Sequence, residues 1–248
     1  MGTAIASDIA DQIVEWLRSG VESAGRRGAV LGLSGGIDSA VTAALCRRAL
    51  GENVLGLIMP CESDPQDEQH AREFAQSIDL VTLTVRLEGA FHELLKVLPG
   101  GLGAARANLK PRLRMTALYH FANSLDYLVV GTGNRSELMV GYFTKYGDGG
   151  ADMLPLGGLY KTQVRKLAAE LGLPEWVIEK APSAGLWEGQ TDEEELGVEY
   201  EKLDLALASV KGELDDAPVA EDVVTNVAAM VRRTAHKRNP APTFRLET

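Results

Sequence analysis

The sequence has little of several features that would assign it to a special class. Only two of its 248 residues are cysteines, Cys46 and Cys61. They form neither a CxxC pair nor a Cys/His zinc pattern, so we expect neither a disulfide framework nor a structural zinc site. No run approaches the roughly 18 apolar residues that a membrane helix needs. The N-terminal residues also lack the basic start and apolar core of a signal peptide. We therefore expect a soluble cytoplasmic protein.

Positive charge is also scarce in this sequence. The 25 lysines and arginines are outnumbered by 35 aspartates and glutamates, which gives a formal net charge of −10. A chain this acidic repels a phosphate backbone, so we do not expect general nucleic-acid binding. A local basic pocket for a nucleotide is still compatible with this balance. The hydrophobic share of 45% is ordinary for a globular protein.

Short apolar runs alternate with helical patterns along the first half of the chain. We expect strands at 29–34, 53–60, 80–87 and 127–133. We expect helices at 5–21, 38–50, 65–78 and 111–125, the second of them ended by Gly51. This alternation is typical of an α/β fold, a doubly wound parallel sheet with helices on both faces. In such sheets ligands bind at the carboxyl ends of the strands.

Other stretches are less regular. Residues 99–110 carry glycine without apolar periodicity, which predicts a flexible loop. Residues 141–158 and 181–190 are also predicted to be irregular and glycine-rich. Thr191 and Glu194 have the spacing of a capping box, which predicts the start of a helix.

The chain is predicted to form a single domain, residues 1–248, with a helical C-terminal extension. Two further helices are expected after the capping box, the last ending near Arg238, and neither a linker nor a repeat interrupts the pattern. The first helix carries an apolar stripe that belongs either to the core or to a subunit interface. The stripe consists of Ile5, Ile9, Ile13 and Leu17.

The stretch GLSGGIDS, residues 32–39, lies between the first predicted strand and a helix. It matches neither GxxxxGK[ST] nor GxGxxG. It offers the backbone N–H groups of Gly35 and Gly36 and two serine hydroxyls at a helix N-terminus, where the dipole favours an anion. Asp38 would repel phosphate unless a divalent cation such as Mg²⁺ lay between them. The alternative is a tight turn whose polar side chains only cap the helix.

The SGGxDS loop resembles the pyrophosphate loop of the N-type ATP pyrophosphatases, which cleave ATP to AMP and pyrophosphate and adenylate an oxygen of their substrate. Longer blocks are similar to NAD synthetase in sequence, order and spacing. They are NLKPRLRM (108–115), GTGNRSE (131–137), GYFTKYGDGGADMLPLGGLYK (141–161), KAPSAGLWEGQTDEEELG (180–197) and HKR (236–238). The resemblance to this family extends from the first strand almost to the C-terminus.

The resemblance implies a ligase that amidates deamido-NAD, the nicotinate adenine dinucleotide, to NAD. The reaction uses ATP, passes through an adenylated intermediate and releases AMP and pyrophosphate. Glutamine-using members carry a separate amidase domain, for which this sequence has no room, and Cys46 lies inside a predicted helix. We therefore expect ammonia as the nitrogen source. The resemblance also implies Mg²⁺ and a homodimer whose dinucleotide site lies near the subunit interface.

The resemblance assigns roles to individual positions. For ATP it implies Gly32, Leu33, Ser34, Gly35, Gly36, Ile37, Asp38, Ser39, Thr132, Lys161 and Ser183. For deamido-NAD it implies Arg112, Lys145, Asp152, His236 and Lys237, and for Mg²⁺ it implies Asp38 and Glu137. The expected catalytic residues are Asp38, Lys161 and Asp152. Lys161 would stabilise charge on the leaving phosphates, and Asp152 would bind ammonium and help to remove its proton.

Each assignment has a structural alternative. Thr132 and Ser183 could be turn hydroxyls. Glu137 could be a carboxylate that favours a helix start, and Lys161 a solvated lysine. Asp152 could be a buried loop aspartate that accepts backbone N–H bonds.

Two arginines and the C-terminal basic pair also have alternatives. Arg112 and Arg114 are two positions apart on a predicted helix, so they point to nearly opposite sides. The resemblance favours Arg112 for the substrate, which leaves Arg114 as a surface or salt-bridge arginine. Pro111 stands where the family more often has alanine, and proline is tolerated in a first helical turn. His236 and Lys237 end a predicted helix, where cations also suit the dipole.

Two other functions fit part of the sequence. Another adenylating amidotransferase or a thiolase of the same superfamily would share the loop, but thiolation enzymes commonly use added cysteines, and none are suitably spaced here. A non-enzymatic nucleotide sensor would have lost metal carboxylates or phosphate contacts, whereas Asp38, Glu137 and Lys161 are all present.

Overall fold

The computed structural model describes residues 2–98, 100–101, 103–183, 185, 191–215 and 218–244, with side chains from residue 8 onward. It contains a parallel sheet with strand order β3-β2-β1-β4. The strands are β1 (Gly28–Gly32), β2 (Val54–Ile58), β3 (Thr82–Thr84) and β4 (Tyr127–Val130). The predicted parallel α/β sheet is confirmed, and because its strands are parallel their carboxyl ends lie at one edge.

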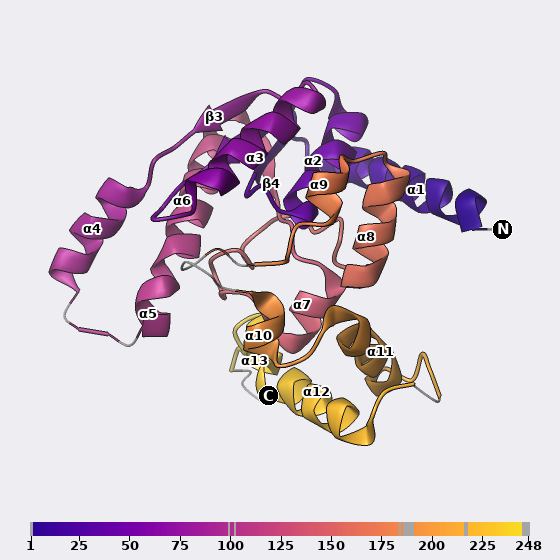
Figure 1. Cartoon of the computed structure of the whole chain (residues 1–248). Helices are drawn as coiled ribbons and strands as arrows, with labels where there is room; N and C mark the ends of the chain where they lie inside the picture. Colours follow the sequence, from indigo (N-terminus) through magenta and orange to yellow (C-terminus); the bar gives the residue numbers. More distant parts are fainter. Residues whose placement is uncertain are drawn as a thin grey trace.

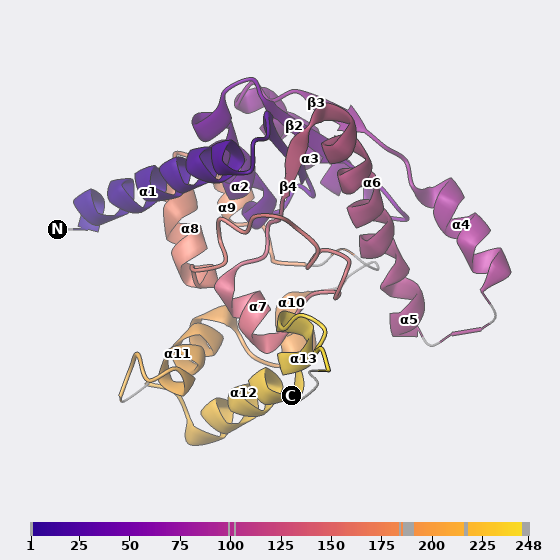
Figure 2. The same ribbon diagram turned by 180° about the vertical axis from the view of Figure 1, so that it is seen from behind.

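Helices cover both faces of the sheet because the strands are apolar on both sides. In β1, Ala29 and Leu31 belong to one core cluster, whereas Val30 between them belongs to another. The first cluster is closed by α1 (Gly2–Ser23), α2 (Ile37–Leu50), α3 (Pro65–Ser77), α8 (Lys161–Glu170) and α9 (Glu175–Ile178). The second is closed by α4 (Glu88–Val97) and α6 (Leu109–Leu125). Figures 1 and 2 show α1 and α8 on one side of the molecule and α4 and α6 on the other.

The first helix contributes to the core. Its buried residues Ala10, Val14, Leu17 and Val21 recur at helical spacing and belong to the first cluster. Each fully buried large apolar side chain of this kind stabilises the fold by roughly 1.5–3 kcal/mol. Of the predicted apolar stripe, Leu17 is buried in this cluster and the half-buried Ile13 packs against it, whereas Ile9 is half-buried and does not belong to the cluster. The buried face of α1 is thus turned from the predicted stripe toward Ala10, Val14 and Val21, and the side chain of Ile5 lies outside the described side chains.

The C-terminal helices gather on one side of the sheet, next to α7 (Arg135–Val140), as Figures 1 and 2 show. They are α10 (Asp192–Leu196), α11 (Tyr200–Val210), α12 (Glu221–Arg233) and α13 (Ala235–Arg238). A third core cluster, which includes Tyr200, Leu207 and Val227, holds α11 and α12 together. The last helix ends at Arg238 as predicted, but three described helices rather than two follow α10.

Two local predictions are wrong. Residues 99–110 are not a loop throughout, because α5 (Gly103–Ala107) and the first residues of α6 are helical. The alanines of this stretch are strong helix formers, and they outweigh its glycines. The helix start predicted at Thr191 is confirmed, because Thr191 is the N-cap of α10, but the capping box does not form, since the Thr191 side chain makes no cap hydrogen bond. The first turn of α10 is instead entirely acidic, which suits the helix dipole.

The irregular stretches are confirmed only where they are described. Residues 141–158 contain neither a helix nor a strand beyond a single bridge at Met153. Most of 181–190 lies outside the described residues. No helix in the described part of the chain is both long and apolar enough to cross a membrane.

Candidate active site

The SGGIDS loop lies at the carboxyl end of β1, where α2 begins. The Ser39 hydroxyl donates to the Gly36 carbonyl at 2.8 Å. The Ser34 hydroxyl donates to Ser39 Oγ at 3.1 Å and accepts the Gly36 N–H at 3.3 Å. Gly35 has a left-handed φ of +76°, which glycine adopts without steric cost. These bonds fold the loop into a compact turn at the start of α2.

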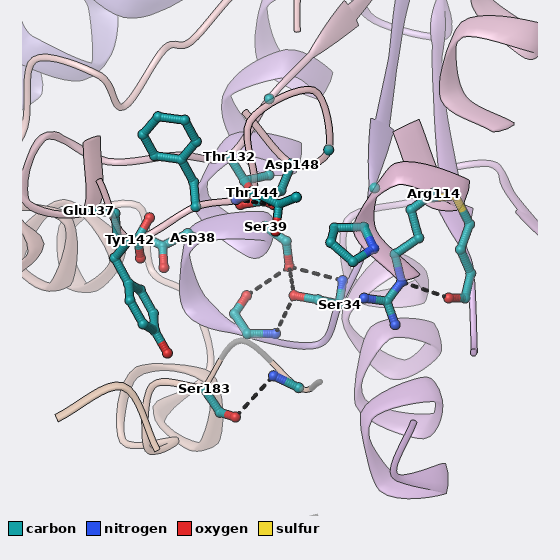
Figure 3. A pocket seen from close by; sticks show the side chains of 18 of the residues that line it. Ser34, Asp38, Ser39, Arg114, Thr132, Glu137, Tyr142, Thr144, Asp148 and Ser183 are labelled. Atoms are coloured by element: carbon teal, nitrogen blue, oxygen red, sulfur yellow. Dashed lines mark hydrogen bonds between the residues drawn. The ribbon is translucent and has the colours of Figure 1, made fainter. Parts of the chain in front are cut away.

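The loop forms one wall of a cavity of about 450 Å³, a usual volume for a small-molecule site. In Figure 3, Asp38 and Glu137 lie at one end of this cavity and Arg114 at the other, with Ser34 and Ser39 between them. The predicted residues that line it are Gly32, Leu33, Ser34, Gly36, Ile37, Asp38, Ser39, Thr132, Glu137, Lys161, Ser183 and Lys237.

A charged cluster lies at one end of the cavity. The side chain of Lys161, at the start of α8, is 2% exposed, and its ammonium bonds to the Asp38 carboxylate. The same ammonium lies 3.4 Å from Glu137 Oε1. Asn134 steadies Asp38 by donating from Nδ2 to Oδ1 at 3.0 Å. Lys161 is therefore not the solvated lysine of the alternative interpretation.

Glu137 caps the start of α7 and also belongs to the charged cluster. It is the third residue of α7 and forms a capping box with Asn134: the Glu137 N–H donates to Asn134 Oδ1 at 3.0 Å, and the Asn134 N–H donates to Glu137 Oε2 at 3.2 Å. Burial and the nearby Asp38 raise the pKa of Glu137 to about 8, although Lys161 opposes the shift. Burial alone would lower the pKa of Lys161, but Asp38 and Glu137 raise it above its ordinary range.

The donor set of the cluster fits a hard divalent cation. Asp38 and Glu137 offer carboxylate oxygens, the ligands that Mg²⁺ prefers. Two ionised carboxylates carry more negative charge than the single positive charge of Lys161 balances. Among the residues that the structure describes, no three His, Cys, Asp or Glu side chains are placed to hold an ion by themselves. Phosphate oxygens or water would therefore have to complete the coordination shell.

A buried polar network next to the cluster escaped prediction. Asp192 is only 3% exposed; it accepts a hydrogen bond from the Tyr200 hydroxyl at 3.1 Å through Oδ2, whereas its buried Oδ1 has no partner. The Lys161 ammonium lies 5.2 Å from the centre of the Tyr200 ring, and Tyr142 donates to Glu195 at 2.5 Å. Burial raises the pKa of Asp192, and Lys161 opposes this. The sequence offered only the acidic run DEEEL as a signal.

Arg114 also lines the cavity. The prediction that Arg114 is a surface or salt-bridge residue is therefore wrong. Its Nε donates to the Met59 carbonyl at 3.1 Å and its Nη2 to Ser63 Oγ at 3.0 Å, and burial lowers its pKa. The packing of α6 explains the placement, because Pro111, Arg114, Met115 and Leu118 share one helix face and all line the cavity.

Arg112 lies on the other side of α6, as the helical spacing predicts, and there it is exposed. Its Nη2 donates to the Lys145 carbonyl at 3.3 Å. Lys145 in turn donates from Nζ to the His236 carbonyl at 2.6 Å. These three predicted dinucleotide residues are thus linked to one another, although none of them lines the cavity.

The other two predicted dinucleotide residues lie apart from each other. Lys237 lines the cavity, and its ammonium donates to the carbonyls of Gly141 and Phe143 at 2.8 Å each. Asp152 is exposed and lies outside the cavity lining; it accepts the Val129 N–H at 2.8 Å. It therefore binds backbone as in the alternative interpretation, although it is not buried. Its action on ammonium stays a prediction.

Comparison with known proteins places the chain among close relatives. A family model described as NAD synthase matches residues 9–241. The NH(3)-dependent NAD(+) synthetase of Carboxydothermus hydrogenoformans is 48% identical, over 92% of this chain and 93% of its own. The NMN synthetase from Francisella tularensis is 36% identical with a TM-score of 0.90, over 97% of this chain and 99% of its own. The NH3-dependent NAD synthetase from Campylobacter jejuni is 28% identical with a TM-score of 0.85, over the same shares.

Proposed function

The chain belongs to the NAD synthase family, and from this membership we propose that it converts deamido-NAD to NAD with ammonia and ATP, releasing AMP and pyrophosphate. ATP-dependent amidation of deamido-NAD is the known reaction of this family. The observation that carries the proposal is the buried Lys161 between Asp38 and Glu137, beside the SGGIDS loop. A reaction that expels pyrophosphate needs such charge neutralisation next to an anion-binding loop.

The first step joins the nicotinate carboxylate to ATP. A carboxylate oxygen attacks the α-phosphorus, the bond from that phosphorus to the bridging oxygen breaks, and pyrophosphate leaves with the electron pair. The loop at residues 32–39 would hold the phosphates through its N–H groups and hydroxyls. Lys161 would stabilise the charge that develops on the leaving group. Holding the two reactants in line supplies much of the acceleration.

The second step replaces AMP with ammonia. The ammonia nitrogen attacks the acyl carbon, the carbon–oxygen bond to AMP breaks, and a proton leaves the new amide nitrogen. Asp152, which the resemblance assigns to the dinucleotide, would also bind ammonium and take this proton. Arg112, Lys145, His236 and Lys237 would hold the dinucleotide.

Asp38 and Glu137 would hold Mg²⁺ together with phosphate oxygens of ATP. The ion supplies charge neutralisation at the phosphates when it is bound. Burial and the neighbouring Asp38 raise the pKa of Glu137, and a bound cation would offset both the loss of solvation and the repulsion between the two carboxylates.

We also propose that the chain acts as a homodimer in the cytoplasm. The group formed by Arg112, Lys145 and His236 lies outside the cavity of a single chain. A dinucleotide is longer than the nucleotide that the cavity would hold. A second copy placed against this group would extend the site along the surface.

A second acceptor is favoured by one comparison. The protein from Francisella tularensis, 36% identical, is an NMN synthetase. The same adenylation chemistry would act on the nicotinate carboxylate of a mononucleotide. The choice between the two acceptors depends on how the adenylate half of the dinucleotide is bound.

The test is product formation by the purified protein. Deamido-NAD and nicotinate mononucleotide are offered separately with ATP and Mg²⁺, each with ammonium or glutamine, and AMP and pyrophosphate are counted. We expect NAD from deamido-NAD with ammonium, with one AMP and one pyrophosphate each. Faster amidation of the mononucleotide would indicate that the protein is an NMN synthetase instead. Absence of ATP cleavage in a folded sample would contradict both.

A further inference from the structure

A second lysine, Lys180, joins three segments around the phosphate loop. Its ammonium lies 2.6 Å from Asp67 Oδ1, 3.1 Å from His70 Nδ1 and 3.2 Å from the Gly35 carbonyl oxygen. A lysine ammonium has three N–H donors, so these three acceptors account for all of them. The side chain is 23% exposed and lines the cavity. Lys180 therefore faces the site while its donors are taken up by the protein.

The acceptors of Lys180 are themselves held in place. Asp67 and His70 belong to the first turns of α3. The His70 ring packs against the ring of Trp176 of α9, with 5.0 Å between ring centres and an angle of 35° between the ring planes. A Cβ added to Gly35 would lie 2.6 Å from the Asp67 carbonyl oxygen, so the loop packs directly on α3. Lys180 thus bonds to the loop from a fixed position.

The bond to Gly35 fixes which side of one peptide faces the cavity. In a trans peptide the carbonyl and the following N–H point in opposite directions. The Gly35 carbonyl points to Lys180, and the Gly36 N–H points to Ser34 Oγ, which lines the cavity. Both residues of this peptide are glycine, so little steric resistance opposes its rotation. A rotated peptide would turn the negative end of its dipole toward a bound phosphate.

We infer that Lys180 is a positioning residue for ATP, which holds the Gly35–Gly36 peptide with its N–H toward the nucleotide phosphates. The inference rests on the proposed function, because it requires ATP in the cavity. Lys180 also anchors the segment that carries Ser183, another residue of the cavity lining. Its role differs from that of Lys161, whose ammonium contacts the carboxylates of the charged cluster.

The test compares two lysine-to-methionine variants. Lys180→Met removes the three bonds and leaves an unbranched side chain only one atom shorter than lysine. Lys166→Met is the matched control, because Lys166 is exposed on α8. For each protein, calorimetry measures the Kd of the α,β-methylene analogue of ATP with Mg²⁺ and, separately, the Kd of deamido-NAD. The midpoint of thermal unfolding shows whether each variant is folded.

We expect Lys180→Met to raise the Kd of the analogue roughly tenfold or more, as for the loss of a charge-assisted hydrogen bond. The Kd of deamido-NAD should change by less than about twofold, and the control should match the unsubstituted protein for both ligands. Lys180→Arg should be intermediate, because a planar guanidinium keeps the charge but cannot match three acceptors placed around an ammonium.

Two results would overturn the inference while leaving the proposed function intact. One is an unchanged Kd of the analogue in a folded Lys180→Met variant. The other is an equal loss of affinity for both ligands, which would indicate general damage to the site. If the unsubstituted protein binds no analogue, the proposed function fails and this inference fails with it.

Discussion

Replacing Lys161 with methionine would remove the ammonium that contacts two carboxylates in the charged cluster. Lys161 is 2% exposed, and the side chains of Asp38 and Glu137 are 16% exposed each. Methionine is also long and unbranched, so the variant loses charge more than packing volume. Removing one partner of a buried ion pair leaves the other uncompensated and costs about 3–5 kcal/mol.

The size of the loss depends on pH, because the carboxylates can take up protons. The pKa of Glu137 is already about 8, against an ordinary value of 4.5, and Lys161 is a group that lowers it. The variant therefore raises this pKa further. Between the unfolded and the folded pKa the folded state binds more protons than the unfolded state, so stability falls as pH rises through this window. We expect a loss of about 3–5 kcal/mol at pH 8.5 and less than about half of it at pH 5.5.

Urea unfolding measures this loss directly. Lys161→Met and the control Lys166→Met are compared with the unsubstituted protein at both pH values, with a chelator present and no nucleotide. The control should change stability by less than about 0.5 kcal/mol. The reasoning is refuted if the loss for Lys161→Met is the same at both pH values, or is below about 1 kcal/mol at pH 8.5.

Three further predictions concern single residues. Gly35→Ala should destabilise the protein by about 1–3 kcal/mol in urea unfolding, because alanine is strained at a positive φ and its Cβ would meet the Asp67 carbonyl oxygen. The control Gly158→Ala should cost less than about 0.5 kcal/mol, because the space around Gly158 is open. Burial raises the pKa of the Cys46 thiol to about 12, so a thiol reagent at pH 8 should label Cys46 only after unfolding, and rapid labelling of the native protein would contradict its burial. Glu137→Gln should raise the Mg²⁺ concentration for half-maximal activity at least about tenfold; an unchanged Mg²⁺ titration would remove Glu137 from the metal site.

The strands and most of the helices that bear the site could be predicted from apolar patterns. The strand ends could not, since apolar residues continue past them. Leu33 and Met59 follow β1 and β2 and are 5% and 7% exposed; Leu33 still donates its N–H to the Leu57 carbonyl at 2.8 Å, but both residues lie beyond the strand ends and line the cavity. Burial alone does not separate a strand residue from a cavity wall. The partition into a single domain stays a prediction.

The site itself could be predicted only in part. The resemblance named Asp38, Glu137 and Lys161, which lie far apart in the sequence and meet at one end of the cavity. It gave no role to Arg114 or Lys180. Their placement depends on the face that α6 turns to the sheet and on the packing of α3 against the loop. Such directions follow from tertiary packing, which a motif does not contain.

The most direct test of the account follows one oxygen atom. Deamido-NAD labelled with ¹⁸O in its nicotinate carboxylate is converted to NAD with ammonium and ATP, and the AMP and pyrophosphate are examined by mass spectrometry. Adenylation of the carboxylate predicts one labelled oxygen in each AMP and none in pyrophosphate. Unlabelled AMP, or label in pyrophosphate, would mean that the carboxylate does not attack the α-phosphorus and would contradict the central claim.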